Sequence, residues 1–303
     1  MHFSFLEFVT PTLAPARRLC LVGPWPLAGE RASNVPDRVR LGPIWRENLH
    51  ELTIVSQELQ SKPEMIDSFT WMISFVIPAH NEEAWVGRSV LAISCAMESV
   101  REPFEIIVVD DASTDATASV AAYNGARVLR VEHRHIAATR NAGARQARGD
   151  VLFFVDADTL VSAEVVSSAL CNIGDGAVGG GCVPRFEGAL PFWWKLAYPF
   201  AAAIVRLLKL PGGACQFCRR DAFEVIKGFS EEHFAAEDAL FVKALKKQGA
   251  FVLLTERVIT SGRNLRSQSF LTIARLLIRL ALRGPDAFRE RRGLELWYHP
   301  KRE

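Results

Sequence analysis

The feature that most constrains the fold is a regular alternation of short apolar runs with longer helical stretches, which begins at Met72. The stretches between the runs have helical spacing and several end in glycine, and the runs themselves read as strands at 72–78, 104–110, 126–131 and 151–155. Strands that are separated by helices of about a dozen residues form a parallel, doubly wound sheet. We therefore predict an α/β fold with a mostly parallel sheet flanked by helices.

The composition sets only broad limits on function. The chain has 303 residues, of which 49% are hydrophobic and 23% are charged, so it can bury at least one sizeable core. The formal net charge of +2 does not identify a charged partner, and nucleic acid is not expected as one. Six scattered cysteines are interpreted as thiols in a reducing compartment.

The ends of the chain differ from the middle. Residues 1–70 lack a sustained hydrophobic period and contain many prolines, so we predict a poorly ordered extension before an α/β domain at 71–262. The most apolar stretch, 190–210, is interrupted by charges and is too short between them for the roughly 20 residues of a bilayer span. The N-terminus lacks the basic region of a secretory signal. These features predict a cytoplasmic protein, with peripheral contact at the cytoplasmic membrane face as an alternative.

Paired carboxylates end two of the predicted strands. Asp110 and Asp111 end the second strand, and Asp156 and Asp158 follow the fourth. Right-handed crossovers place the carboxyl ends of the strands along one edge, where open sheets bind their ligands. Two carboxylates at such a position favour a hard divalent cation, Mg²⁺ or Mn²⁺, which usually also holds substrate phosphates. The alternative is that both acids cap the turn that follows.

Glycine-rich phosphate loops are missing from the sequence after the first strand. That strand runs into "IPAHNEE", which matches neither G-x-G-x-x-G nor G-x-x-x-x-G-K-[ST]. The sequence therefore argues against a dinucleotide dehydrogenase and against a P-loop nucleotidase.

Five segments occur in a recognisable order and spacing. They are "FVIPAHNEE", "VVDDASTD", "ATRNAGARQARGD", "VLFFVDADT" and "GFSEEHFAAEDALFVKALKKQG". Together they resemble the family 2 glycosyltransferases, which are inverting enzymes of the GT-A fold. The resemblance covers residues 73–262, and "TSGR" at 260–263 is similar to the family's sequence after the catalytic helix.

The resemblance implies which residues bind the nucleotide of the donor. Pro78, His80 and Glu82 match the family loop that touches the base and the ribose, although many members carry tyrosine or another residue where this chain has His80. Asp111, with Asp110 beside it, matches the acid that hydrogen-bonds the nucleobase. The implied donor is a UDP-sugar or a GDP-sugar.

The resemblance also implies a catalytic set. Arg140 matches a family residue near the donor, and Asp156 and Asp158 form the DxD motif, in which Asp158 would be the direct metal ligand and Asp156 would contact both donor and metal. Asp238 matches the catalytic base, with Glu237 beside it. For Asp238 taken alone, the alternative is an acid at a helix N-terminus, where the helix dipole favours negative charge.

The implied reaction is metal-dependent transfer of a sugar with inversion, as in a hexosyltransferase. A cation held by the DxD carboxylates would stabilise the charge on the departing nucleoside diphosphate. Asp238 would remove the proton of the acceptor hydroxyl on the opposite face of the sugar. A single in-line displacement then inverts the anomeric carbon, as in inverting glycoside hydrolysis with an alcohol in place of water.

The acceptor leaves a weaker signature. Segments 190–210 and 269–284 combine leucines and aromatic residues with basic residues, a composition typical of helices in the membrane interface. Such helices could equally cover the sheet or a partner subunit. We predict a basic amphipathic helical tail at 263–303 that packs on the domain or on a membrane. A membrane position would suit a lipid-linked acceptor or a product such as a glycolipid or cell-surface polysaccharide, and otherwise the acceptor is an unknown sugar.

Two competing hypotheses use the same residues. The first is a catalytically inactive, donor-binding and membrane-associated scaffold of the same fold, which would be favoured by loss of the DxD motif or the base, and both are present. The second is a metal-dependent phosphohydrolase or phospho-acceptor domain that uses Asp110 and Asp111. That class needs a lysine at a later strand end, and none can be placed in this sequence.

Overall fold

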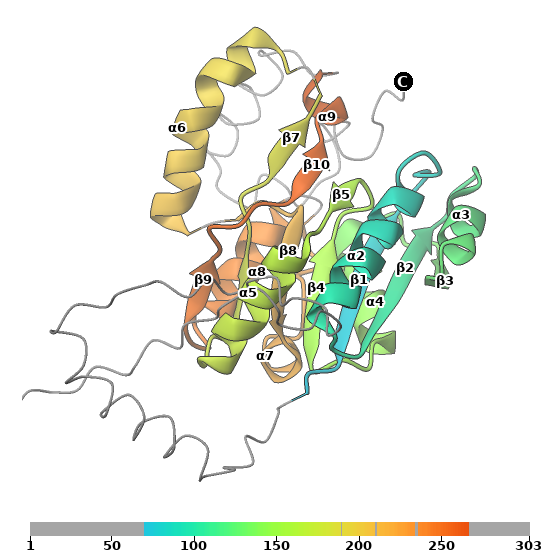
Figure 1. The fold of residues 1–303 in the computed structure, drawn as a ribbon, viewed down its shortest axis with the longest axis horizontal. Helices are drawn as coiled ribbons and strands as arrows, with labels where there is room; N and C mark the ends of the chain where they lie inside the picture. Colours follow the sequence, from blue (N-terminus) through green and yellow to red (C-terminus); the bar gives the residue numbers. More distant parts are fainter. Residues whose placement is uncertain (1–69, 189, 210, 234–235, 267–303) are drawn as a thin grey trace, which may run out of the picture. The chain divides into compact units, whose positions relative to one another are not determined.

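The structure is a computed structural model, and it describes residues 70–188, 190–209, 211–233 and 236–266 (Figure 1). Almost all of the predicted N-terminal extension at 1–70 lies outside the described residues. The same holds for the predicted tail at 263–303 beyond its first four residues.

The described residues contain a central sheet of seven strands in the order β3-β2-β1-β4-β8-β6-β9. The neighbours β3, β2, β1 and β4 all pair in parallel, whereas β8 runs antiparallel to both β4 and β6. The predicted mostly parallel α/β sheet is thereby confirmed. The strands are β1 (Ile73–Ala79), β2 (Phe104–Asp111), β3 (Arg127–Val131), β4 (Val151–Val155), β6 (Gly179–Gly181), β8 (Cys215–Arg219) and β9 (Phe251–Leu253).

Helices cover both faces of this sheet, and each face has its own core. Helices α2, α3 and α5 pack on one face, and α4, α7 and α8 pack on the other. Strand β4 contributes to both cores, because successive side chains point to opposite faces: Phe153 joins the first core and Phe154 the second. The helices are α2 (Val86–Val100), α3 (Thr117–Tyr123), α4 (Ile136–Gln146), α5 (Ala163–Gly174), α7 (Arg220–Val225) and α8 (Glu237–Leu245).

Helix α4 packs closely on the sheet at a glycine. A Cβ atom at Gly143 would come within 2.4 Å of the Val76 side chain and 2.7 Å of the Val109 side chain, on β1 and β2. Real Cβ atoms do not approach other atoms so closely, so only glycine fits here without a shift of the helix. This close packing sets the position of the residues on α4, including Arg140.

A second, small sheet lies beyond the carboxyl end of β4. It consists of three strands in the order β5-β10-β7, and β5 starts directly after Asp158. Helix α6 lies beside this sheet, and α9 follows β10 (Figure 1). The elements are β5 (Thr159–Leu160), β7 (Arg185–Glu187), β10 (Ile259–Ser261), α6 (Phe192–Leu208) and α9 (Arg263–Arg266).

Within the part of the chain that the structure describes, no helix combines the length and the apolar character that a bilayer crossing requires.

Candidate active site

The carboxylates that follow β4 are held by both sheets. The backbone N–H of Asp156 donates to the carbonyl oxygen of Ala214 beside β8 (3.1 Å). Asp158 accepts from the Thr260 hydroxyl (3.3 Å), and its carbonyl oxygen accepts from the N–H of Ser261 (3.1 Å). Residues before β8 and within β10 therefore hold the turn after β4 and keep both carboxylates at the edge of the central sheet.

Both of these carboxyl groups are hard to ionise in this structure. Burial raises the pKa of Asp156 to about 7, where Arg140 works against the rise and the charge of Asp158 adds to it. Burial likewise raises the pKa of Asp158 to about 6, against the opposing influence of Arg263. Loss of water thus disfavours negative charge at this edge unless positive charge is supplied.

Arg140 connects the strand-end acids with the acids of α8. Its side chain is only 2% exposed, and its Nη2 donates to Asp156 Oδ1 at 3.0 Å. Its Nη1 donates to Asp238 Oδ1 at 2.5 Å and to Glu237 Oε1 at 3.3 Å. Although burial opposes the charge of Arg140, the surrounding carboxylates raise its pKa above the ordinary value. The structure therefore brings three residues predicted from the sequence together, and Arg140 lies beneath the surface.

Asp238 lies in the first turn of α8, where the helix dipole favours an acid. Its carboxylate lies against the backbone of Gly213. A Cβ atom at position 213 would come within 2.2 Å of Asp238 Oδ2. Any larger residue at position 213 would displace the carboxylate. Neighbouring Glu237 is buried, and this burial raises its pKa to about 8, with the charge of Asp238 adding to the effect.

Arg263 forms a second basic contact, on the other side of the DxD motif. It follows β10 and pairs with the carboxylate of Glu82, which lies in the loop after β1. The same Nη2 lies 3.4 Å from Asp158 Oδ2. The guanidinium Cζ is also 5.8 Å from the ring centroid of Trp85. Glu82 is therefore joined to the DxD motif through an arginine that the sequence did not identify as a site residue.

The loop after β1 is tied to the loop after β2. Pro78 lies within β1, paired with Val109, and His80 Nδ1 donates to the carbonyl oxygen of Asp111 at 2.7 Å. Asn81 has a positive φ of 53°, and its side-chain oxygen accepts from the N–H of Thr114 at 2.6 Å. These contacts place His80 beside the end of β2.

Asp110 and Asp111 have different surroundings because adjacent strand residues point to opposite faces. The carboxylate of Asp111 accepts from the N–H groups of Arg134 (2.7 Å) and His135 (3.1 Å) and from the Thr139 hydroxyl (2.7 Å), at the start of α4. This carboxylate is thus engaged within the protein by three donors.

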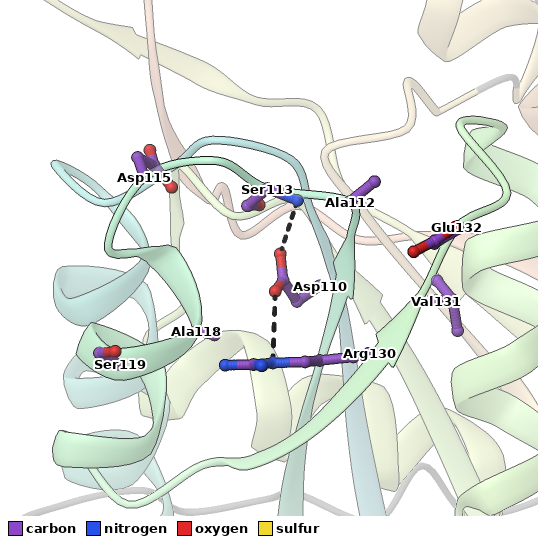
Figure 2. Close-up of a pocket in the computed structure, with 9 residues that line it drawn as sticks. All are labelled: Asp110, Ala112, Ser113, Asp115, Ala118, Ser119, Arg130, Val131 and Glu132. Carbon is purple, nitrogen blue, oxygen red and sulfur yellow. Dashed lines mark hydrogen bonds and ion pairs between the residues drawn. The ribbon is translucent and has the colours of Figure 1, made fainter.

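The carboxylate of Asp110 instead faces a pocket between β2, β3 and α3. The pocket has a volume of about 350 Å³, and Figure 2 shows Asp110 between Ser113 and Arg130 on its wall. Asp110 accepts from the N–H of Ser113 (3.3 Å) and lies 4.0 Å from Arg130 Nε. Of the two acids that end β2, Asp110 is the one that lines this pocket.

Three residues of this site were not predicted as functional from the sequence: Gly213, Arg263 and, beyond its mention as a neighbour, Glu237. The only signal for Arg263 was its place in "TSGR", and its partner Glu82 lies 181 positions away. No local pattern connects residues so far apart, so only the tertiary structure identifies the contact.

The DxD carboxylates fit a hard divalent cation in their chemistry. Among the described residues, no group of three or more His, Cys, Asp or Glu side chains is arranged to hold a metal ion. Asp156 and Asp158 provide two oxygen ligands, and Mg²⁺ or Mn²⁺ at such sites commonly takes its remaining ligands from phosphates and water. The raised pKa values of both acids fit this role, because a bound cation would compensate their buried charge.

Comparison with known proteins identifies the family. The family model described as "Glycosyl transferase family 2" matches residues 74–226, about half of the chain. Validoxylamine A glucosyltransferase of Streptomyces hygroscopicus subsp. limoneus is 34% identical over 106 residues, which cover 33% of this chain and 23% of that protein. Undecaprenyl-phosphate 4-deoxy-4-formamido-L-arabinose transferase of Pseudomonas paraeruginosa is 35% identical over 108 residues, or 32% of this chain and 30% of that protein. The matched region thus spans less than a third of either relative.

Among solved structures, the mannosyltransferase PcManGT of Pyrobaculum calidifontis in complex with GDP-Man and Mn²⁺ is similar with a TM-score of 0.53. The similarity covers 76% of this chain and 71% of that one at 18% sequence identity. At such low identity it is evidence for a shared fold only. The shared architecture confirms the predicted GT-A-type fold. Together with the family match over half its length, it shows that this chain belongs to glycosyl transferase family 2.

Proposed function

We propose that this protein is a metal-dependent, inverting glycosyltransferase that moves a sugar from a UDP-sugar or a GDP-sugar to an acceptor hydroxyl. The observation that carries the proposal is the meeting of Asp156 and Asp238 on one guanidinium, that of Arg140. An acid at the sheet edge suits the cation that would hold the donor's diphosphate, and an acid at a helix start suits the acceptor hydroxyl. Both roles need the two groups a short distance apart.

Asp156 and Asp158 would hold Mg²⁺ or Mn²⁺ together with the donor's diphosphate. When bound, the ion supplies Lewis-acid stabilisation of the charge that develops on the leaving diphosphate. The partly buried setting of the two carboxylates, whose side chains are 34% and 12% exposed, strengthens such electrostatic effects relative to bulk water. The PcManGT structure, which is a complex with GDP-Man and Mn²⁺, supports the same assignment for this chain.

Asp238 would act as the general base on the acceptor. Its side chain is 26% exposed, so a hydroxyl can approach it. Arg140 donates to Oδ1, which fixes the orientation of the carboxylate and leaves Oδ2 for the acceptor. A positioned carboxylate of this kind contributes about 10²–10⁴-fold to the rate.

The pocket beside Asp110 would take the nucleobase. Its carboxylate can accept a hydrogen bond from a base N–H, whereas the carboxylate of Asp111 already accepts from three donors. We therefore propose that Asp110 reads the base, and that Asp111 acts by holding the start of α4 in place. His80 and Glu82, in the adjoining loop, would lie near the ribose.

Thermal stability in the presence of nucleotide sugars tests the proposed function. We expect a UDP-sugar or a GDP-sugar with Mn²⁺ to raise the Tm, because a ligand at about 100 times its Kd stabilises the folded state by about 2.7 kcal/mol. EDTA should remove most of this increase. Asp158→Asn should lose the metal-dependent part, whereas Asp175→Asn, at an exposed acid after α5, should behave as wild type. If no nucleotide sugar raises the Tm with either metal, the proposal fails.

Helix α6 carries an exposed apolar face. Phe192, Phe200 and Leu207 are 83%, 69% and 83% exposed, and their spacing of eight and seven residues places them on one face of the helix. The opposite face packs on the small sheet, where Trp194 and Tyr198 contact the ring of Phe186.

We propose that this face contacts the membrane interface peripherally and that the acceptor is lipid-linked. Exposed aromatic and leucine side chains along one helix face are typical of helices that lie in the interface. The name of the Pseudomonas relative, which includes undecaprenyl-phosphate, supports a lipid-linked acceptor. The remaining predicted contribution, from segment 269–284, lies outside the described residues.

Replacement of Phe192, Phe200 and Leu207 by serine is expected to reduce cosedimentation with anionic liposomes by about tenfold or more. Each such side chain contributes about 1.5–3 kcal/mol when fully buried in an apolar phase, and 1.4 kcal/mol corresponds to a factor of ten. Leu91→Ser, at an exposed leucine on α2, is the matched control and should not change binding. Equal cosedimentation of the triple variant and wild type would rule out α6 as the membrane contact.

A further inference from the structure

Arg263 places a positive charge where the DxD motif would bind a metal ion. Its Nη2 pairs with the Glu82 carboxylate and lies 3.4 Å from Asp158 Oδ2. The three side chains are largely buried, with exposed fractions of 24% for Arg263, 15% for Glu82 and 12% for Asp158. The guanidinium therefore neutralises the same carboxylate that the proposed function assigns to the divalent cation.

The hydrogen bonds of this guanidinium are incomplete. Its Nε is buried and has no hydrogen-bond partner among the described residues. A buried donor without an acceptor costs free energy. The guanidinium of Arg263 therefore does not use all of its donors in its contacts with Glu82 and Asp158. An incoming anion would provide the acceptors that these donors lack.

The position of Arg263 in the fold permits a change of partner. It belongs to α9, a helix of only four residues that follows the three-residue strand β10. One side of its guanidinium faces Trp85, at 5.8 Å from the ring centroid. Guanidinium groups bind phosphate oxygens in a bidentate manner, so a diphosphate at the DxD edge would be a preferred ligand.

We propose that Arg263 is an internal counter-cation that competes with the divalent ion for Asp158 and releases this carboxylate when a nucleoside diphosphate binds. The inference rests on the proposed function, because it assumes that a metal ion binds at Asp156 and Asp158. Two positive groups cannot both occupy the Oδ2 side of Asp158 without repulsion. The diphosphate would draw the guanidinium away, so that metal and nucleotide each strengthen the binding of the other.

The test measures Mn²⁺ binding without a sugar, from the electron paramagnetic resonance signal of unbound Mn²⁺, with and without UDP or GDP. Wild type is expected to bind Mn²⁺ weakly alone and more tightly with nucleotide. Arg263→Gln should bind Mn²⁺ alone about tenfold more tightly, and the nucleotide should then add little. Arg263→Lys keeps the charge but not the planar fork, so its Mn²⁺ affinity should fall between the other two.

Arg266→Gln is the matched control. Arg266 lies on the same short helix and donates to the carbonyl oxygen of Glu187 at 3.4 Å, so the variant loses the same charge without touching Asp158 or Glu82. Its Mn²⁺ binding should equal that of wild type. If it instead matches Arg263→Gln, the effect is one of net charge and the competition proposal is wrong.

The outcomes separate this inference from the proposed function. If wild type binds Mn²⁺ with nucleotide but folded Arg263→Gln binds Mn²⁺ alone no more tightly, the inference is overturned and the proposed function stands. If wild type binds no Mn²⁺ even with nucleotide, the metal site of the proposed function fails, and the inference fails with it. Circular dichroism establishes folding, and should the glutamine variant not fold, the comparison of Arg263→Lys with wild type decides.

Discussion

Replacing Asp238 with asparagine is expected to lower kcat by about 10²–10⁴-fold and to leave the Kd of the nucleotide sugar within about threefold of the wild-type value. The amide is close in shape to the carboxylate but cannot accept the proton of the acceptor hydroxyl. Its position at the start of α8 is set by the backbone and by the space that Gly213 leaves. The donor's diphosphate would be bound elsewhere, at Asp156 and Asp158, so donor binding should persist.

This experiment needs both a rate and a binding measurement. Release of nucleoside diphosphate in the presence of acceptor gives kcat, and the nucleotide-dependent Tm increase reports donor binding. Asp221→Asn, at a 61% exposed carboxylate on α7, controls for loss of a charge and should retain full turnover. Unchanged kcat in Asp238→Asn would refute the assignment of the base. A wild type that binds donor but transfers to no acceptor would instead favour the donor-binding scaffold.

Replacing Arg140 with methionine is expected to lower the free energy of unfolding by about 3–5 kcal/mol, which is the usual cost of removing one partner of a buried ion pair. Its guanidinium is the shared partner of Asp156, Glu237 and Asp238, and methionine would leave these three carboxyl groups without it. Arg140→Lys keeps the charge but not the forked geometry, so its loss of stability should be smaller. Chemical denaturation of the metal-free variants, followed by circular dichroism, measures both changes.

The loss in Arg140→Met should grow as the pH rises. Burial raises the pKa of Asp156 to about 7 and that of Glu237 to about 8, from ordinary values of 3.8 and 4.5. The stability that these two groups contribute is therefore present below pH 4 and is lost as the pH rises through 7 and 8. Without Arg140 both pKa values should rise further, and each additional proton held by the folded state steepens the fall by about 1.4 kcal/mol per pH unit.

Unfolding curves of metal-free wild type and Arg140→Met at pH 5, 7 and 9 provide the measurement. Arg130→Met, at an arginine whose side chain is 78% exposed, is the control and should show no comparable loss at any of the three pH values. A destabilisation of Arg140→Met that is the same at pH 5 and pH 9 would show that lost packing, rather than unpaired carboxylate charge, explains it.

Much of the central sheet could be predicted from the sequence because its signals are local. A run such as Val151–Val155 is buried on both faces, so five successive residues are apolar and the strand is evident. The acids that follow it must then lie at the ligand-binding edge. The antiparallel strand β8 was not predicted. Cys215–Arg219 follows a long segment that contains α6, and its antiparallel pairing with β4 is a long-range contact that no local sequence pattern indicates.

The sequence by itself determined a doubly wound α/β domain, with carboxylates at the ends of β2 and β4 and an acidic start to α8. These features depend on hydrophobic periodicity and on the order of segments along the chain, and both can be read from the amino-acid sequence. Only the tertiary structure decided that Asp110 lines the pocket between β2, β3 and α3, that Arg140 pairs with acids after β4 and in α8, and that Arg263 lies next to Asp158. Such relations depend on which way a side chain points and on contacts between residues up to 181 positions apart, and close packing of the whole chain sets both.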